Sequence, residues 1–217
     1  NLINILILIF VFLILFIMSV FFSLVIILFS VIIHEYMHGW MANYLGDTTA
    51  RDDGRLTLNP LVHIDLWGSI LMPAMLYFGT GGNFIFGYAK PIPFNPCNLR
   101  DQKYGTAKIA IAGPLANLFV ALVFGLSLRF LLNISQEMVI FIVAVVQVNL
   151  ALFVFNLLPI PPLDGSKVIA SFLSYSWQEK LMFLEQYGII IVMLFIFFGF
   201  SFIMPIINSL FKLIVGV

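Results

Sequence analysis

The sequence predicts an all-α polytopic membrane protein. Hydrophobic residues make up 62% of the 217 residues and charged residues only 9%, whereas a soluble chain carries roughly 25% charged residues. Apolar runs long enough to cross a bilayer recur along the chain. The ionisable residues gather mainly in the connections between these runs. No soluble core could bury so much apolar surface, which includes 24 Phe side chains, behind so few charges.

The charge balance and the cysteine content exclude several classes of protein. Ten basic and ten acidic residues give a net charge of zero. A nucleic-acid-binding protein needs a basic face, so no nucleic-acid partner is expected. The single cysteine, Cys97, excludes an internal disulfide and a cysteine-rich zinc module. The N-terminal apolar run, 2–33, far exceeds the roughly 7–15 residues of a signal-peptide core, so it is not expected to be a cleavable signal.

The first helical region is expected over residues 2–45. As one helix it would be about 65 Å long, twice a hydrocarbon core of about 30 Å. We therefore expect it to fold back or to lie partly in the interface. The first hydroxyl-bearing stretch, 18–23, is the expected break, although it contains neither Gly nor Pro. This division gives spans at 2–18 and 22–45.

Three further spans are expected, near 104–132, 137–158 and 182–203. The first two of these are expected to form a three-helix core with 22–45, and the remaining spans flank that core. Pro205 is expected to close the last span, because proline interrupts helices. Residues 206–217 are too few to cross the bilayer again, so they are expected to form an interfacial tail.

Two shorter elements complete the predicted fold. The apolar run 64–78 contains Gly68 and Pro73 and is expected to be re-entrant, which is tolerated only where protein shields the backbone. Residues 84–94 alternate aromatic residues before two prolines, which predicts a small membrane-associated β-hairpin with an exposed edge. Such an edge could pair with an extended substrate segment. An ordinary interfacial loop with aromatic anchors is nearly as good an interpretation.

The basic residues predict which side of the membrane the connections occupy. Eight of the ten basic residues lie in or beside three connections, 46–63, 80–104 and 159–181. The hairpin of the two middle spans places the second and third connections on one face. A re-entrant 64–78 segment would place the first connection there too. By the positive-inside rule, that face is cytoplasmic.

Ionisable residues inside a predicted span indicate chemistry. Each costs roughly 2.5–3.5 kcal/mol near the centre of a membrane helix. His34 and His38 stand four residues apart at the end of the second span, so they share one helical face at the spacing of two imidazole ligands of Zn²⁺. Glu35 lies beside them, free to take a proton from a water molecule. The alternative is that all three are helix-end residues meeting the aqueous interface.

A catalytic zinc needs a third protein ligand and an open position for water. Another apolar span breaks down at three prolines just before Asp164, which the predicted topology places on the same face of the membrane as the histidines. Taken alone, Asp164 would be a turn or N-cap residue before a helix at 166–173. Paired with two histidines at matching depth, it is better interpreted as the third ligand.

These patterns together resemble the site-2 protease family of intramembrane zinc metalloproteases. The motifs that carry the resemblance are His34-Glu35-x-x-His38, Ala-Gly-Pro-Leu-Ala-Asn at 112–117 and the run from Asn156 to Gly165. Three more stretches, 45–47, 54–60 and 87–91, resemble its small branch without a PDZ insert. The resemblance covers roughly residues 20–175. One departure is Asp65-Leu66, where Asp-Pro is expected, and it concerns the shape of the 64–78 segment rather than the metal.

The resemblance implies a role for each residue of the motifs. Zn²⁺, one per chain, would be bound by His34, His38 and Asp164, with Glu35 as the general base, which agrees with the interpretation of the residues alone. Asn117 and Asn156 would contribute to substrate binding or to hydrogen bonding in the transition state. The equal alternative for these two amides is that they join helices within the bilayer.

His63 lies outside these motifs. It is more often an interface histidine than a ligand in such a position, although a supporting role beside the metal site stays open.

The predicted function is hydrolysis of a peptide bond within or beside a transmembrane segment of a membrane-protein substrate. A single membrane-embedded domain, 1–217, with a catalytic core at about 20–175, would carry it out from the cytoplasmic side of a multi-pass, prokaryotic cell membrane. The lipid bilayer and the substrate are the expected partners. The alternative is a membrane metal-ion transporter or metal-binding protein that uses the same His and Asp residues. Glu35 favours the protease, because a carrier does not need a base beside its ligands.

Overall fold

The computed structural model describes residues 2–79, 87–131 and 134–216, with the side chains of Met18 and of the described residues from Val20 onward. Its helices are α1 Leu2–Tyr44, α2 Thr49–Asp52, α3 Pro60–His63, the π-helix η1 Leu66–Leu71, α4 Met72–Gly79, the 3₁₀-helix η2 Pro96–Asn98, α5 Gly105–Phe130, α6 Gln136–Asn156, α7 Asp164–Ala170, α8 Tyr175–Glu185, α9 Gly188–Phe198 and α10 Phe200–Val215. No residue of these described ranges lies in a β-strand. The secondary structure of the described residues is thus all-helical, as predicted, and the predicted β-hairpin is wrong for this part of the chain.

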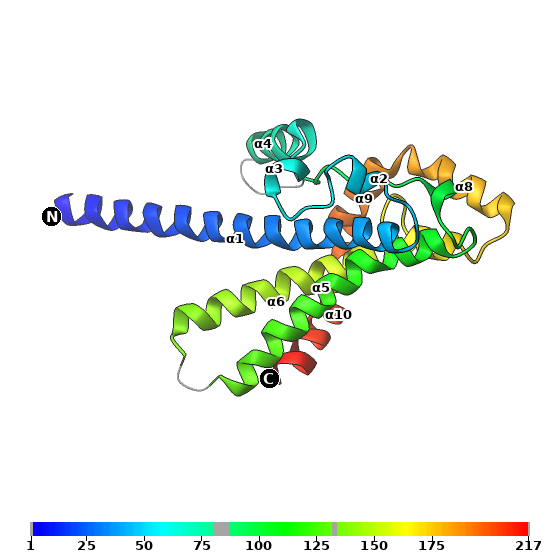
Figure 1. Ribbon diagram of the computed structural model, residues 1–217. Coiled ribbons are helices and arrows are strands. Elements are labelled where there is room, and N and C mark those ends of the chain that lie inside the picture. The colour runs from blue at the N-terminus through cyan, green and yellow to red at the C-terminus, as the bar shows by residue number, and fades with distance from the viewer. Residues whose placement is uncertain (1, 80–86, 132–133, 217) are drawn as a thin grey trace.

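Helix α1 is continuous, so the break expected at 18–23 is absent (Figure 1). The stretch holds only residues that a helix accepts, and its hydroxyl groups do not interrupt it. The helix ends at a left-handed glycine, Gly46, with φ 111°. The Asp47 amide donates back to Ala42 O at 2.9 Å and the Gly46 amide to Asn43 O at 3.1 Å. These two hydrogen bonds give the carbonyl groups in the last turn of α1 a partner, and the chain turns sharply away from the helix axis.

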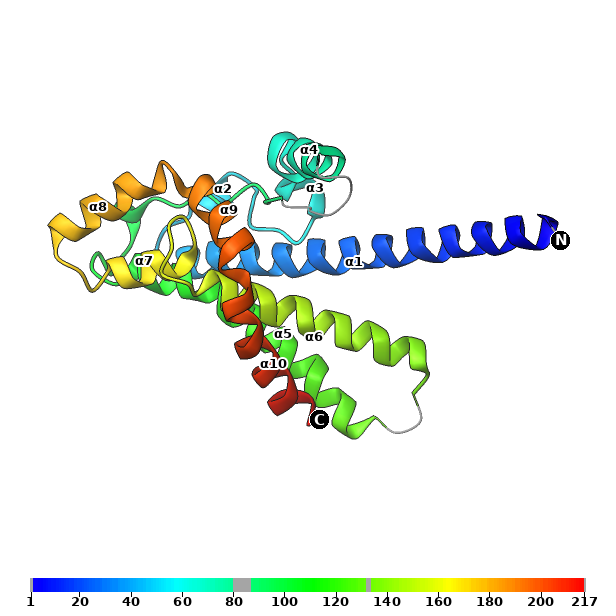
Figure 2. The same cartoon turned by 180° about the vertical axis from the view of Figure 1, so that it is seen from behind.

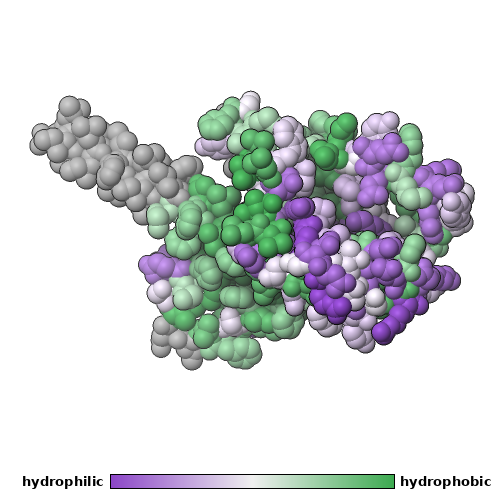
Figure 3. Space-filling view, turned by 45° about the horizontal axis from the view of Figure 1, so that its top comes forward, coloured by the Kyte–Doolittle hydropathy of each residue, from purple (hydrophilic) through white to green (hydrophobic). Residues whose placement is uncertain are grey.

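Among the described residues, three helices are long and apolar enough to cross a membrane: Val20–Tyr44 of α1, then α5 and α6. They coincide with the predicted core spans and pack against one another. Small buried residues of α5, among them Ala112, Ala116 and Ala121, allow the close approach. In the hydropathy view of Figure 3, apolar residues cover the region of these helices, and polar residues gather at the end of the molecule that carries the connections.

The C-terminal part of the chain differs from the prediction. The span expected at 182–203 is a pair of helices, α8 and α9, bent by 78°. Pro205 lies inside α10, which packs across α5 and α6 (Figure 2) and buries Ile207 and Ile214 in their shared core. The Arg129 guanidinium donates to Ile214 O at 2.7 Å and to Leu213 O, which holds the end of α10 against α5. Residues 206–215 are thus part of the packed core and not a separate tail.

The segment expected to form the hairpin lies partly outside the described residues, since 84–86 are not among them. The described part, 87–94, is extended, but its backbone pairs with several different partners instead of a second strand. The Tyr88 amide donates to Gly68 O at 3.0 Å and the Lys90 amide to His63 O at 2.9 Å. Two prolines in the segment lack an N–H, so no regular ladder can form along its other side.

The apolar segment after α3 forms η1 and α4, a helical stretch of about 21 Å at 1.5 Å per residue. It is shorter than a hydrocarbon core of about 30 Å. Its re-entrant path stays a prediction.

Candidate active site

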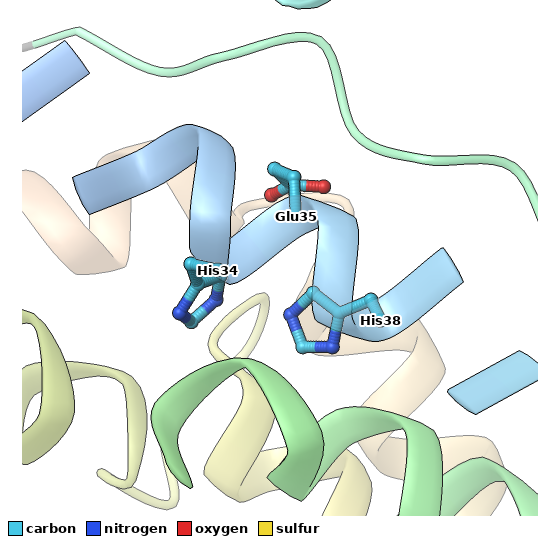
Figure 4. A group of neighbouring side chains, drawn as sticks. All are labelled: His34, Glu35 and His38. Atoms are coloured by element: carbon cyan, nitrogen blue, oxygen red, sulfur yellow. The ribbon is translucent and has the colours of Figure 1, made fainter. Parts of the chain in front are cut away.

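His34 and His38 lie one turn apart on α1 and direct both imidazole rings toward α5 (Figure 4). The ring centroids are 4.6 Å apart and the ring planes are nearly perpendicular, at 86°. His34 is buried, with 6% of its surface exposed. The spacing of four residues therefore brings two nitrogen donors to the same place inside the helical core, as the sequence predicts.

Asp164, the first residue of α7, reaches the same place from the opposite end of the chain. Its Oδ2 lies 3.0 Å from His34 Nε2 and 3.3 Å from His38 Nε2. The following residue, Gly165, packs directly against the carbonyl groups of Leu157 and Leu158, where α6 has just ended. A side chain at position 165 would push α7 away, so this close approach sets the position of Asp164.

Asp164 is a carboxylate in this setting. Burial by itself raises the pKa of its carboxyl, but hydrogen bonds from His34 and His38 outweigh burial and hold the pKa well below its ordinary value. Its oxygen is thus available as an anionic donor.

Both histidines are held in the tautomer that a metal ligand requires. His38 Nδ1 lies 2.7 Å from Ile109 O, and a carbonyl can only accept, so Nδ1 carries the proton. His34 Nδ1 lies 2.6 Å from Asn117 Oδ1. Nε2 of each ring faces Asp164. When it is protonated it donates to this carboxylate, and when it loses that proton it offers the lone pair that a metal ion requires.

The orientation of the Asn117 amide follows from its own partners. Its Nδ2 donates to Ser30 O at 3.1 Å and to Asn149 Oδ1 at 2.9 Å, which leaves Oδ1 to accept from His34. Asn149 in turn donates to Ser30 Oγ at 2.9 Å. These groups are buried, and they come from α1, α5 and α6, so the three core helices jointly orient His34.

Gly113 provides the space in front of the two rings. A Cβ at this position would lie 2.5 Å from His38 Nε2 and 2.7 Å from His34 Nε2. Only the absence of a side chain allows α5 to pass so close to both donor atoms.

The donor set fits Zn²⁺. A tetrahedral zinc with ligand bonds of about 2.0–2.1 Å separates its ligand atoms by about 3.3 Å. The two measured N···O separations, 3.0 and 3.3 Å, agree with that value. Two neutral imidazoles and one carboxylate are also a known ligand set of catalytic zinc. His34, His38 and Asp164 would hold the ion.

Glu35 leaves α1 in a different direction from the two rings (Figure 4). Its Oε2 accepts a hydrogen bond of 3.0 Å from the backbone amide of Ile92. One carboxylate oxygen of Glu35 and one ring nitrogen of each histidine nevertheless lie within 4.8 Å of one another. The carboxylate is therefore beside the metal-binding group, where a base is needed.

Comparison with known proteins finds relatives that are named as zinc metalloproteases. "Putative zinc metalloprotease YwhC" of Bacillus subtilis (strain 168) is 35% identical over 178 residues, which cover 78% of this chain and 77% of the relative. The chain belongs to peptidase family M50. The sequence model of that family, "Peptidase family M50", matches residues 129–200, which include Asp164. The predicted family and the predicted class, a metallopeptidase, are confirmed, and the Zn²⁺ cofactor agrees with the donor set.

Two mycobacterial relatives of this M50 peptidase are longer than the chain. "Putative zinc metalloprotease Rip2" of Mycolicibacterium smegmatis is 31% identical over 166 residues, covering 76% of this chain and 62% of the relative. The Rip2 of Mycobacterium tuberculosis (strain H37Rv) is 28% identical over 170 residues, with coverage of 76% and 62%. No solved structure matches the chain significantly.

The remaining predicted residues of the M50 peptidase occupy different environments. Asn117 lies at the site but is fully buried, and its contacts are to His34 and to the other core helices. Asn156 donates to Leu152 O in its own helix at 3.0 Å, and no hydrogen bond to the site is found for it among the described residues. His63 is buried, and its Nε2 forms a hydrogen bond of 2.7 Å with Thr57 O. This hydrogen bond does not involve His34 or His38.

Several residues of the site were not predicted. Asn149 and Ser30 complete the support of His34, and Ile92 contacts Glu35 through its backbone. A polar side chain inside an apolar helix is a signal that could have pointed to Asn149. The contact made by Ile92 uses a group that every residue except proline has, so no sequence signal marks it.

Proposed function

We propose that this M50 peptidase is an intramembrane zinc endopeptidase that hydrolyses a peptide bond in or beside a transmembrane segment of a membrane protein. The observation that carries the proposal is the position of Asp164 Oδ2, which lies 3.0 Å from His34 Nε2 and 3.3 Å from His38 Nε2. Two of the three proposed ligands lie on a helix that is long and apolar enough to span a membrane, so the site acts on bonds that reach the same depth. The substrate is therefore a protein that also enters the bilayer.

The proposed roles follow the chemistry of each group. Bound zinc polarises the scissile carbonyl and lowers the pKa of water. Glu35 takes a proton from the attacking water while the water oxygen bonds to the carbonyl carbon of the substrate. Glu35 then gives that proton to the amide nitrogen as the C–N bond breaks, which leaves a free carboxylate and a free amine. Asn117 and Ile109 O keep the proton on Nδ1 of each histidine, so that Nε2 stays available for the ion.

The substrate segment must unwind locally to be cut. A helix in the bilayer hides its carbonyl groups in its own hydrogen bonds, so helix-weak residues are expected near the scissile bond. We place the site toward the cytoplasmic side of the cell membrane. The support for this is the basic character of the connections 46–63, 80–104 and 159–181.

The experiment compares zinc content and cleavage of a single-span test substrate for the wild type, Glu35→Gln and His38→Ala. Glu35→Gln is expected to keep zinc and to lose cleavage by about 10²–10⁴-fold, because only the proton acceptor is gone. His38→Ala is expected to lose both. Undiminished cleavage by Glu35→Gln contradicts the proposed mechanism. Loss of zinc from Glu35→Gln makes Glu35 a ligand and favours the ion site of a transporter.

A further inference from the structure

The extended segment 88–95 crosses α1 beside Glu35 and contacts this carboxylate through its backbone. The Ile92 amide donates to Glu35 Oε2 at 3.0 Å. Ile92 itself is buried, with 7% of its surface exposed, so water competes little for its amide.

The local sequence is Pro91-Ile92-Pro93, so the amide of Ile92 is the one backbone donor of this tripeptide. Proline fixes its own φ near −65°, and a residue that precedes proline is confined to extended conformations. The direction of the Ile92 N–H is therefore largely set by the chain itself, before Glu35 is considered.

The segment is also fastened on both sides of this amide. Arg55 donates to Pro91 O and to Lys90 O, each at 2.9 Å. Beyond the prolines, the Asn95 amide donates to Asp47 Oδ2 at 2.6 Å. Two charged side chains thus hold the backbone before and after the donor.

The Ile92 side chain packs directly on α1. A Cβ at Gly39 would lie 3.0 Å from Ile92 Cγ2, which shows how closely the segment approaches the helix one turn after Glu35. The donor and the carboxylate are consequently fixed to the same short piece of α1.

We propose that Ile92 is a positioning residue for Glu35, and that its amide fixes one carboxylate oxygen so that the other is left to accept the proton. The inference rests on the proposed function, because it requires Glu35 to be the base. The carboxylate of a glutamate is carried by three rotatable bonds and samples many orientations, and a rigid donor selects one of them.

The experiment replaces the Ile92 amide by an ester in the full-length chain, with the α-hydroxy acid analogue of isoleucine, which removes the N–H and keeps the side chain. The matched control is the same replacement at Lys90, because the Lys90 amide lies in the same segment but donates to His63 O and not to Glu35. The ester at Ile92 is expected to lower kcat by about 10- to 100-fold, the loss typical of one hydrogen bond to a charged group, at unchanged KM and zinc content. The ester at Lys90 is expected to stay within about threefold of wild type. An Ile92 ester variant with wild-type kcat overturns the proposal, and so does a loss explained by raised KM or lost zinc.

A second measurement does not depend on activity. Hydrogen exchange of the Ile92 amide is expected to accelerate at least about 10-fold in Glu35→Ala, since its acceptor is gone. An unchanged exchange rate overturns the proposal. The failure of each proposal can be told apart. If Glu35→Gln is active, Glu35 is not the base and the proposed function fails. If Glu35→Gln is inactive but the Ile92 ester variant is fully active, only the proposed role of Ile92 fails.

Discussion

Replacing Gly113 by alanine tests the geometry of the metal site directly. In an ordinary helix interior this change stabilises a protein by roughly 0.5–1 kcal/mol, because glycine is the more flexible residue. Here the new Cβ would lie 2.5 Å from His38 Nε2 and 2.7 Å from His34 Nε2. Carbon atoms in normal contact are about 3.5–4.0 Å apart. Either α5 or the two rings must therefore move by about 1 Å.

A displacement of this size exceeds what a zinc site accepts, since its ligand distances vary by only about 0.2 Å. We expect the zinc affinity of Gly113→Ala to fall by about 100-fold or more, and cleavage to fall with it. Overpacking costs about 1–3 kcal/mol, so the free energy of unfolding falls by roughly 0–2.5 kcal/mol, with a central value of about 1 kcal/mol. The sign is thus opposite to that of an ordinary Gly→Ala change.

The assay is zinc retention against a competing chelator, together with thermal unfolding of the detergent-solubilised chain. Gly79→Ala is the matched control, because a Cβ at that helical position meets no atom within 4 Å. It should keep wild-type zinc affinity. Gly113→Ala that binds zinc and cleaves as well as the wild type would refute the reasoning, because α5 would then not limit the space before the rings.

Two more predictions follow from the groups around the site. Asn117→Leu removes the acceptor of His34 Nδ1 and should lower zinc affinity about 10- to 100-fold in the same chelator assay; unchanged affinity would show that the amide does not orient the ring. Burial raises the pKa of Asp47, but hydrogen bonds from Thr49 and Asn98 outweigh it and hold the pKa below 3.8. The depressed pKa contributes stability that is present above pH 3.8 and is lost as the pH falls through the folded value. Melting temperatures between pH 6 and 3 should therefore fall less steeply for Asp47→Asn than for wild type, and equal slopes would contradict this.

The placement of the two histidines beside each other could be predicted because its signal is local. The spacing of His34 and His38 fixes their common face, and the scarcity of ionisable residues in apolar spans makes such a pair stand out. To place Asp164 beside the histidines, the side of the membrane that it occupies had to be inferred as well. The contact of Asp164 with both histidines agrees with the inferred side.

The hydrogen bonds that orient His34 could not be predicted, because they depend on which faces of the helices pack against one another. The Asn149–Ser30 contact joins residues 119 positions apart, and either side chain could have faced lipid. The segment 87–94 shows the same limit. Its alternating pattern fits a strand, yet its amides pair with a carbonyl of η1, the last carbonyl of α3 and the carboxylate of Glu35. Alternation specifies which side chains share a face, but not which acceptors the backbone finds.

The donor set combines residues that leave the ribosome at very different times. His34 and Asp164 are 130 positions apart. At synthesis rates of about 5–20 residues per second, the carboxylate follows the imidazole by about 7–26 s. During that interval α1 can already lie in the bilayer, but the nascent chain offers only two nitrogen donors. A two-ligand site binds zinc weakly and lacks the geometry for hydrolysis. With the proposed ligand set, peptidase activity therefore cannot begin before Asp164 has been made and α7 has packed beside α1.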